Sequence, residues 1–104
     1  MDDYTAVLER AIDEYGEECQ IDKAIEEMSE LTKALLKRRY VSKDYEIDIL
    51  DDAIAEEIAD VEIMIKQLKM IHQFEYKVLQ YKKEKIERLE RRLNESGRKG
   101  QADA

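Results

Sequence analysis

Residues 47–72 read IDILDDAIAEEIADVEIMIKQLKMIH. Their apolar positions recur every three or four residues, at Ile47, Leu50, Ile54, Ile58, Val61, Ile65 and Leu68. This spacing is typical of a helix that packs one face against other helices. The segment therefore predicts a long helix over residues 47–72 and favours an all-α fold.

Three further segments predict helices on either side of this one. The first runs from about Asp3 to Tyr15 and ends at Gly16, because glycine often terminates helices. The second spans about residues 18–39 and has an apolar stripe at helical spacing, made of Ile21, Ala24, Ile25, Met28, Leu31 and Leu35. The last is rich in charged residues and runs from about Phe74 or Glu75 to Leu93 or Asn94.

The composition agrees with a small helical protein. The chain has 104 residues, no proline and three glycines, so we expect a four-helix bundle-type subunit. A single all-α domain is expected over residues 1–95 and a flexible tail over residues 96–104. The predicted helix over residues 47–72 is apolar over a wide arc, and one small subunit has few other helices to cover that surface. We therefore expect a homo-oligomer, a dimer or tetramer in which helices of two subunits form a shared bundle.

The charge and the amino terminus narrow the partners and the compartment. A net charge of −8 argues against a nucleic-acid partner, because a polyanion is repelled by an acidic surface. No apolar run approaches the roughly 20 residues of a membrane span, so no membrane partner is expected. The acidic start lacks a signal-peptide pattern and the single Cys19 forms no internal disulfide, so we expect a cytoplasmic protein.

Two pairs of acidic residues, Glu27 with Glu30 and Glu57 with Asp60, lie on successive predicted helices. Acidic residues make up 26 of the 104, so pairs at this spacing also arise by chance, but only these two lie within strong apolar patterns. At about 100° per residue, Glu57 falls about 60° from Ile54 and belongs to the buried sector of its helix. Four carboxylates could therefore converge on one divalent metal ion.

Two interpretations of these acidic residues are open. Glutamates that flank an apolar seam commonly reach solvent or pair with a neighbouring basic residue. A metal site is the alternative, because no lysine or arginine shares the inward sector with Glu57 and an unpaired buried carboxylate is costly. Oxygen ligands without a nearby histidine favour Mg²⁺, with Mn²⁺ as a second choice.

Residues 21–35, IDKAIEEMSELTKAL, and residues 53–68, AIAEEIADVEIMIKQL, resemble the MazG-type all-α nucleoside triphosphate pyrophosphohydrolases. That superfamily includes the dimeric dUTPases and phosphoribosyl-ATP pyrophosphohydrolase. The order Glu-x-x-Glu, a gap, then Glu-x-x-Asp is shared with the flanking residues, and the similarity covers about residues 18–95.

The resemblance implies Mg²⁺-dependent hydrolysis of a nucleoside triphosphate to the monophosphate and pyrophosphate in nucleotide-pool housecleaning. It implies that the catalytic metal ligands are Glu27, Glu30, Glu57 and Asp60. It also implies that basic residues of the last helix bind phosphates, for which this chain offers Lys82, Lys85 and Arg88. The usual downstream pattern of basic residues is not fully matched.

The sequence does not identify which nucleobase the protein would recognise. Gln20, Lys23 and Ala34 share a strip of their helix with the acidic pair and could line a pocket, although residues at such positions are usually ordinary surface residues. The alternative to an enzyme is a non-catalytic helical oligomerisation or interaction module whose carboxylates are solvated.

Overall fold

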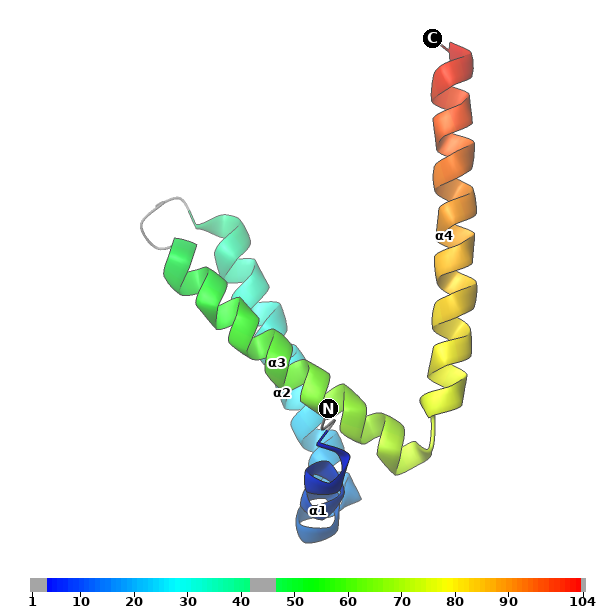
Figure 1. The fold of residues 1–104 in the computed structure, drawn as a ribbon. Helices are drawn as coiled ribbons and strands as arrows, with labels where there is room; N and C mark the ends of the chain where they lie inside the picture. The colour runs from blue at the N-terminus through cyan, green and yellow to red at the C-terminus, as the bar shows by residue number, and fades with distance from the viewer. Residues whose placement is uncertain (1–3, 42–46, 104) are drawn as a thin grey trace. The chain divides into compact units, whose positions relative to one another are not determined.

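The computed structural model describes residues 4–41 and 47–103, with side chains as far as Gly97. These residues form four helices and no strand, which confirms the all-α prediction (Figure 1). The helices are α1 (Thr5–Tyr15), α2 (Glu17–Tyr40), α3 (Ile47–His72) and α4 (Glu75–Asp103). Internal contacts divide the chain into two units, Met1–His72 and Gln73–Ala104.

Gly16 both ends α1 and starts α2. Its backbone has φ 92° and ψ 151°, a conformation that favours glycine. Its N–H donates to the carbonyl of Ile12 at 2.8 Å, and its own carbonyl accepts from the N–H of Gln20 at 3.1 Å. The chain therefore turns sharply between the two helices, as the sequence predicted.

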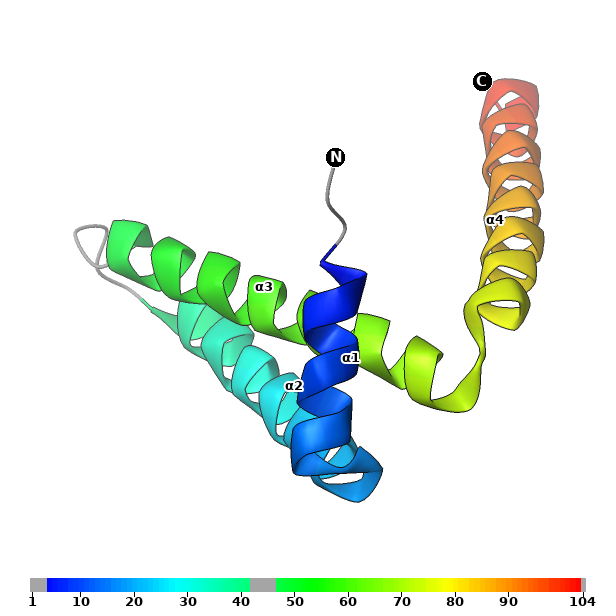
Figure 2. The ribbon, with the colours of Figure 1, turned by 60° about the horizontal axis from the view of Figure 1, so that its bottom comes forward.

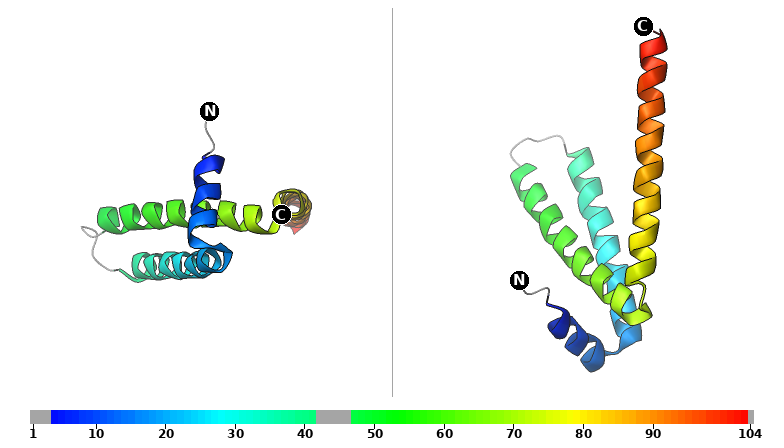
Figure 3. Two further views of the ribbon diagram at one scale, coloured as in Figure 1. Left: turned by 90° about the horizontal axis from the view of Figure 1, so that it is seen from below. Right: turned by 45° about the vertical axis from the view of Figure 1, so that its right-hand side comes forward.

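The first unit is built on an antiparallel pair of helices. α2 and α3 lie side by side, and α1 lies across them and contacts both (Figures 2 and 3). Ala24 from α2 and Val61 and Met64 from α3 form the buried apolar core. Near the end of α2, Arg38 Nε donates to Asp51 Oδ1 at 2.8 Å and links the two helices again.

The buried face of α3 is rotated relative to the predicted one. Ile58 and Ile65, which the apolar pattern placed in the buried sector, are 42% and 41% exposed, so the single chain does not bury them. Val61, Met64 and Gln67 are buried instead. The cause is that α2 packs on the side of α3 that carries Glu57. Glu57, which lies at the edge of the predicted apolar face, is therefore found where the two helices meet.

α4 is longer than predicted. The predicted end at Leu93 or Asn94 is wrong, because the helix continues to Asp103. A single glycine costs a helix only about 1 kcal/mol relative to alanine, so Gly97 need not terminate it, and no proline follows. The flexible tail and the single domain over residues 1–95 stay predictions.

None of the described helices combines the length and the hydropathy that crossing a bilayer requires.

Candidate metal centre

Three carboxylates from two helices converge at the middle of the α2–α3 pair. Glu27 on α2 and Glu57 and Asp60 on α3 each offer one oxygen, and these oxygens lie within 4.8 Å of one another. The α3 residues share a face because they are three positions apart. All three residues are half-buried, so the cluster is partly shielded from water.

Glu57 is the least compensated member of the cluster. Its Oε2 atom is buried and has no hydrogen-bond partner among the described residues. Burial raises the pKa of Glu57, and the charges of Glu27, Asp60, Glu30 and Glu56 raise it further. The inward position predicted for Glu57 is confirmed, as is the exposed position predicted for Glu56.

Glu27 and Glu30 each have a cationic neighbour on α2. Lys23 Nζ lies 3.4 Å from Glu27 Oε1, and Lys33 Nζ lies 3.4 Å from Glu30 Oε1. The Glu27 side chain is 14% exposed, whereas that of Glu30 is 44% exposed and is not part of the three-carboxylate cluster. Pairing with a neighbouring lysine, one of the two interpretations, therefore describes these two residues but not Glu57.

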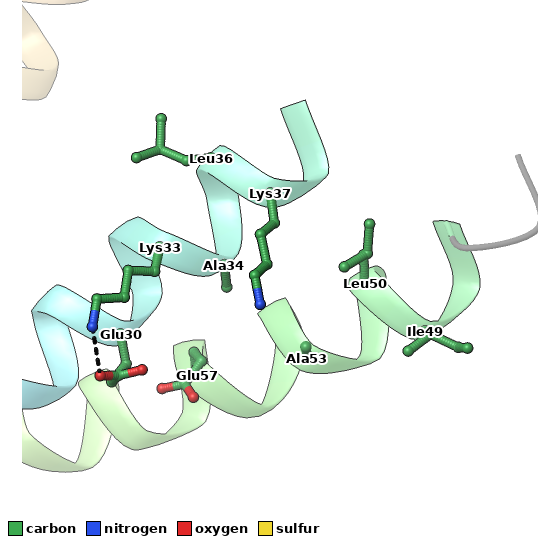
Figure 4. A pocket seen from close by; sticks show the side chains of 9 residues that line it. All are labelled: Glu30, Lys33, Ala34, Leu36, Lys37, Ile49, Leu50, Ala53 and Glu57. Carbon is green, nitrogen blue, oxygen red and sulfur yellow. Dashed lines mark hydrogen bonds and ion pairs between the residues drawn. The ribbon is translucent and has the colours of Figure 1, made fainter. Parts of the chain in front are cut away.

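A hollow of about 690 Å³ opens on one side of the carboxylates. Glu30 and Glu57 line it together with two lysines of α2, Lys33 and Lys37 (Figure 4). Lys33 points back to Glu30, while Lys37 extends from α2 toward α3. Both carboxylates and ammonium groups therefore line this hollow. Such a lining could bind a cation through the carboxylates and a phosphate through the ammonium groups.

A second hollow, of about 600 Å³, opens beside the other two carboxylates. Its lining includes Glu27 and Asp60, and also side chains from all three helices of the unit, namely Ala11, Tyr15, Cys19, Gln20, Lys23, Ile63, Met64 and Gln67. The four predicted metal ligands thus stand between two hollows of different chemistry.

The predicted phosphate-binding residues lie in the second unit. Lys82, Lys85 and Arg88 are exposed side chains of α4. Their role at the carboxylates stays a prediction.

Lys33, Lys37 and Gln67 were not identified from the sequence as site residues. Helical spacing could have indicated them, because Lys33 and Lys37 follow Glu30 by about one and two turns and Gln67 follows Asp60 by about two turns. Surface lysines at such spacing are common, however, and give little signal on their own.

Comparisons of the chain with protein-family models, with curated proteins and with solved structures gave no match.

Proposed function

We propose that the protein is a Mg²⁺-dependent nucleoside triphosphate pyrophosphohydrolase. The observation that carries this proposal is the convergence of Glu27, Glu57 and Asp60 within 4.8 Å, with an unpartnered buried oxygen on Glu57. Neighbouring carboxylates repel one another, and a divalent cation between them relieves both the repulsion and the burial of Glu57. The resemblance to MazG-type enzymes, carried by the same residues, supplies the reaction.

The residues fit Mg²⁺ or Mn²⁺. Glu27, Glu57 and Asp60 would hold the ion, with Glu30 as a fourth ligand once it leaves Lys33. All of these ligands are carboxylate oxygens, which suit hard divalent cations. When bound, such an ion supplies charge neutralisation at the phosphates and acidifies a water molecule.

The remaining chemistry falls to the side chains around the cluster. Lys33 and Lys37 would bind the outer phosphates, because their hollow adjoins Glu30 and Glu57. A water oxygen bonds to the α-phosphorus while the bond from that phosphorus to the α–β bridging oxygen breaks, so pyrophosphate leaves with the bonding electrons. A carboxylate of the cluster takes the proton of the water, and the second product is a nucleoside monophosphate.

The direct test is a panel of standard and modified nucleoside triphosphates with Mg²⁺, with pyrophosphate and monophosphate measured separately. We expect release of both products from at least one substrate, and none when Mg²⁺ is chelated. No turnover of any substrate at high enzyme concentration would contradict the proposal.

Self-association is proposed together with the activity. Met28 and Leu35 on α2 are 40% and 48% exposed, comparable with Ile58 and Ile65 on α3. Helical spacing places the two residues of each pair on one face of their helix, and these four exposed apolar side chains are here named the isoleucine face. A second copy of the chain would cover this face and complete a helical bundle.

A non-catalytic oligomerisation module is the alternative that the isoleucine face favours. Such a module needs no cation, so its melting temperature should be the same with and without Mg²⁺. The enzyme proposal requires a rise in melting temperature, because a ligand that binds only the folded state stabilises it.

A further inference from the structure

The second hollow contains a buried polar group that the proposed metal centre does not use. Gln67 is 4% exposed, and its Oε1 atom has no hydrogen-bond partner among the described residues. A buried amide oxygen without a partner is costly, and buried polar side chains in proteins are nearly always hydrogen-bonded. A methionine or leucine would fill this position without that cost, so the amide requires an explanation other than packing.

A second amide lies on the facing helix. Gln20 on α2 is also 4% exposed and lines the same hollow. It precedes Glu27 by about two helical turns, and Gln67 follows Asp60 by about two turns. Since α2 and α3 are antiparallel, both amides lie in the same direction from the carboxylates. The hollow therefore has a carboxylate end and an amide end.

The other side chains of the hollow suit a flat heterocycle. Met64 provides a buried apolar surface and Tyr15, which is 64% exposed, an aromatic ring at its rim. A largely apolar cavity with a few fixed polar groups is the usual form of a small-molecule site, and about 600 Å³ accommodates a nucleoside. The lysine-lined hollow lies on the opposite side of the carboxylates, where charge rather than amide chemistry dominates.

We propose that this second hollow, lined by Gln20 and Gln67, is the base subsite, and that Gln67 Oε1 accepts a hydrogen bond from an N–H of the nucleobase. The inference rests on the proposed function, since it takes the ligand to be a nucleotide. It assigns an orientation to the substrate, with the base toward Tyr15 and Gln67 and the outer phosphates toward Lys33 and Lys37. Gln67 then acts as a specificity residue and has no part in the bond cleavage.

The test compares Gln67→Met, which has a similar length and no amide, with the unchanged chain. The kcat/KM of each protein is measured on the nucleoside triphosphate panel, and inorganic tripolyphosphate with Mg²⁺ serves as a base-free competitive inhibitor. We expect kcat/KM for the best substrate to fall roughly 10- to 100-fold in the variant and the preference among bases to narrow, because a buried base contact is lost. The inhibition constant of tripolyphosphate should be unchanged.

The melting temperature separates a binding role from a structural one. Replacing a buried amide whose Oε1 atom has no partner among the described residues by an apolar side chain should maintain or raise the melting temperature of Gln67→Met. A variant that melts lower but keeps the full preference among bases would overturn the proposal, and so would an equal loss of tripolyphosphate binding. If the unchanged chain hydrolyses no nucleotide at all, the proposed function itself fails. Turnover with unaltered base preference in Gln67→Met refutes the base subsite alone. If the variant does not fold, Gln20→Met is measured for kcat/KM on the same panel and for inhibition by tripolyphosphate, with the same expected and contradicting results for these two quantities.

Discussion

Carboxylate oxygens of Glu27 and Glu57 lie within 4.8 Å of one another, on two different helices. Glu27 has a cationic partner, Lys23 at 3.4 Å, whereas Glu57 has a buried oxygen with no partner among the residues described. The asymmetry makes Glu57 the residue on which a bound cation should have the largest effect.

The first prediction concerns Glu57→Gln. The amide has nearly the same shape as the carboxylate but lacks its charge, so the variant should retain the fold and lose about 100-fold or more of the Mg²⁺-dependent hydrolysis. Glu56→Gln is the matched control, because Glu56 is the exposed neighbour. Pyrophosphate release by the two variants should differ sharply. Equal activity in both would refute the orientation assigned to α3.

The second prediction concerns stability without metal. Glu57→Gln removes one charge from a cluster of repelling carboxylates, so the metal-free variant should melt at a slightly higher temperature than the unchanged chain. Mg²⁺ should raise the melting temperature of the unchanged chain and of Glu56→Gln, and raise it much less in Glu57→Gln. Thermal unfolding followed by circular dichroism, with and without Mg²⁺, measures all three proteins. A larger Mg²⁺ effect in Glu57→Gln would contradict the assignment.

The third prediction is a pH dependence. The pKa of Glu57 is raised above its ordinary value of 4.5 in the folded protein, so between the two values the folded state binds more protons than the unfolded state. Without metal, the contribution of Glu57 to the free energy of unfolding therefore falls as pH rises between these two pKa values. The same contribution increases on mild acidification. The melting temperature of the unchanged chain minus that of Glu57→Gln should increase as pH is lowered toward 5. An opposite slope would show that the Glu57 carboxylate is stabilised in its charged form.

The fourth prediction concerns the isoleucine face. Ile58→Glu places a charge on a surface that a second copy is proposed to cover, so the variant should sediment as a monomer of 12.3 kDa at micromolar concentration. Ala59→Glu is the control, since residue 59 is exposed and lies about 100° further around α3. The control and the unchanged chain should sediment as a dimer or tetramer. A monomeric unchanged chain would contradict the proposed self-association.

The fifth prediction decides between two sets of phosphate-binding residues. If the hollow between α2 and α3 holds the outer phosphates, Lys37→Met should raise KM for the substrate several-fold with a smaller effect on folding stability. If the α4 residues Lys82, Lys85 and Arg88 hold the phosphates, as the resemblance implies, Lys85→Met should have the larger effect. Steady-state kinetics of both variants decides the question, and equal loss would indicate that both groups contribute.

Much of the fold was predictable because helical periodicity is a local property. The apolar spacing of residues 47–72 gave the bounds of α3, and Gly16 marked the end of α1. The carboxyl end of α4 was missed because the glycines at 97 and 100 suggested an earlier end. The helix continues through both glycines. Which face of α3 is buried depends on the packing of α2, and this is a tertiary property that the spacing of apolar residues alone did not determine.

The candidate site was predictable to a similar depth. Glu57 and Asp60 share a helix face because they are three positions apart. Glu27 could be assigned to the same site because the two acidic pairs lie on successive predicted helices. The burial of Gln20 and Gln67 could not be predicted, because glutamine is usually exposed and nothing in its local sequence sets it apart. Their common hollow exists only because α1, α2 and α3 pack together.

The central claim is that the carboxylates between α2 and α3 hold a divalent cation. Its most direct test is a titration with Mn²⁺, in which electron paramagnetic resonance reports the free ion and hence the number of ions bound. We expect saturable binding by the unchanged chain and by Glu56→Gln, competition by Mg²⁺, and loss of that binding in Glu57→Gln. Absence of saturable binding by the unchanged chain, or binding that survives in Glu57→Gln, would contradict the metal centre and the activity proposed for it.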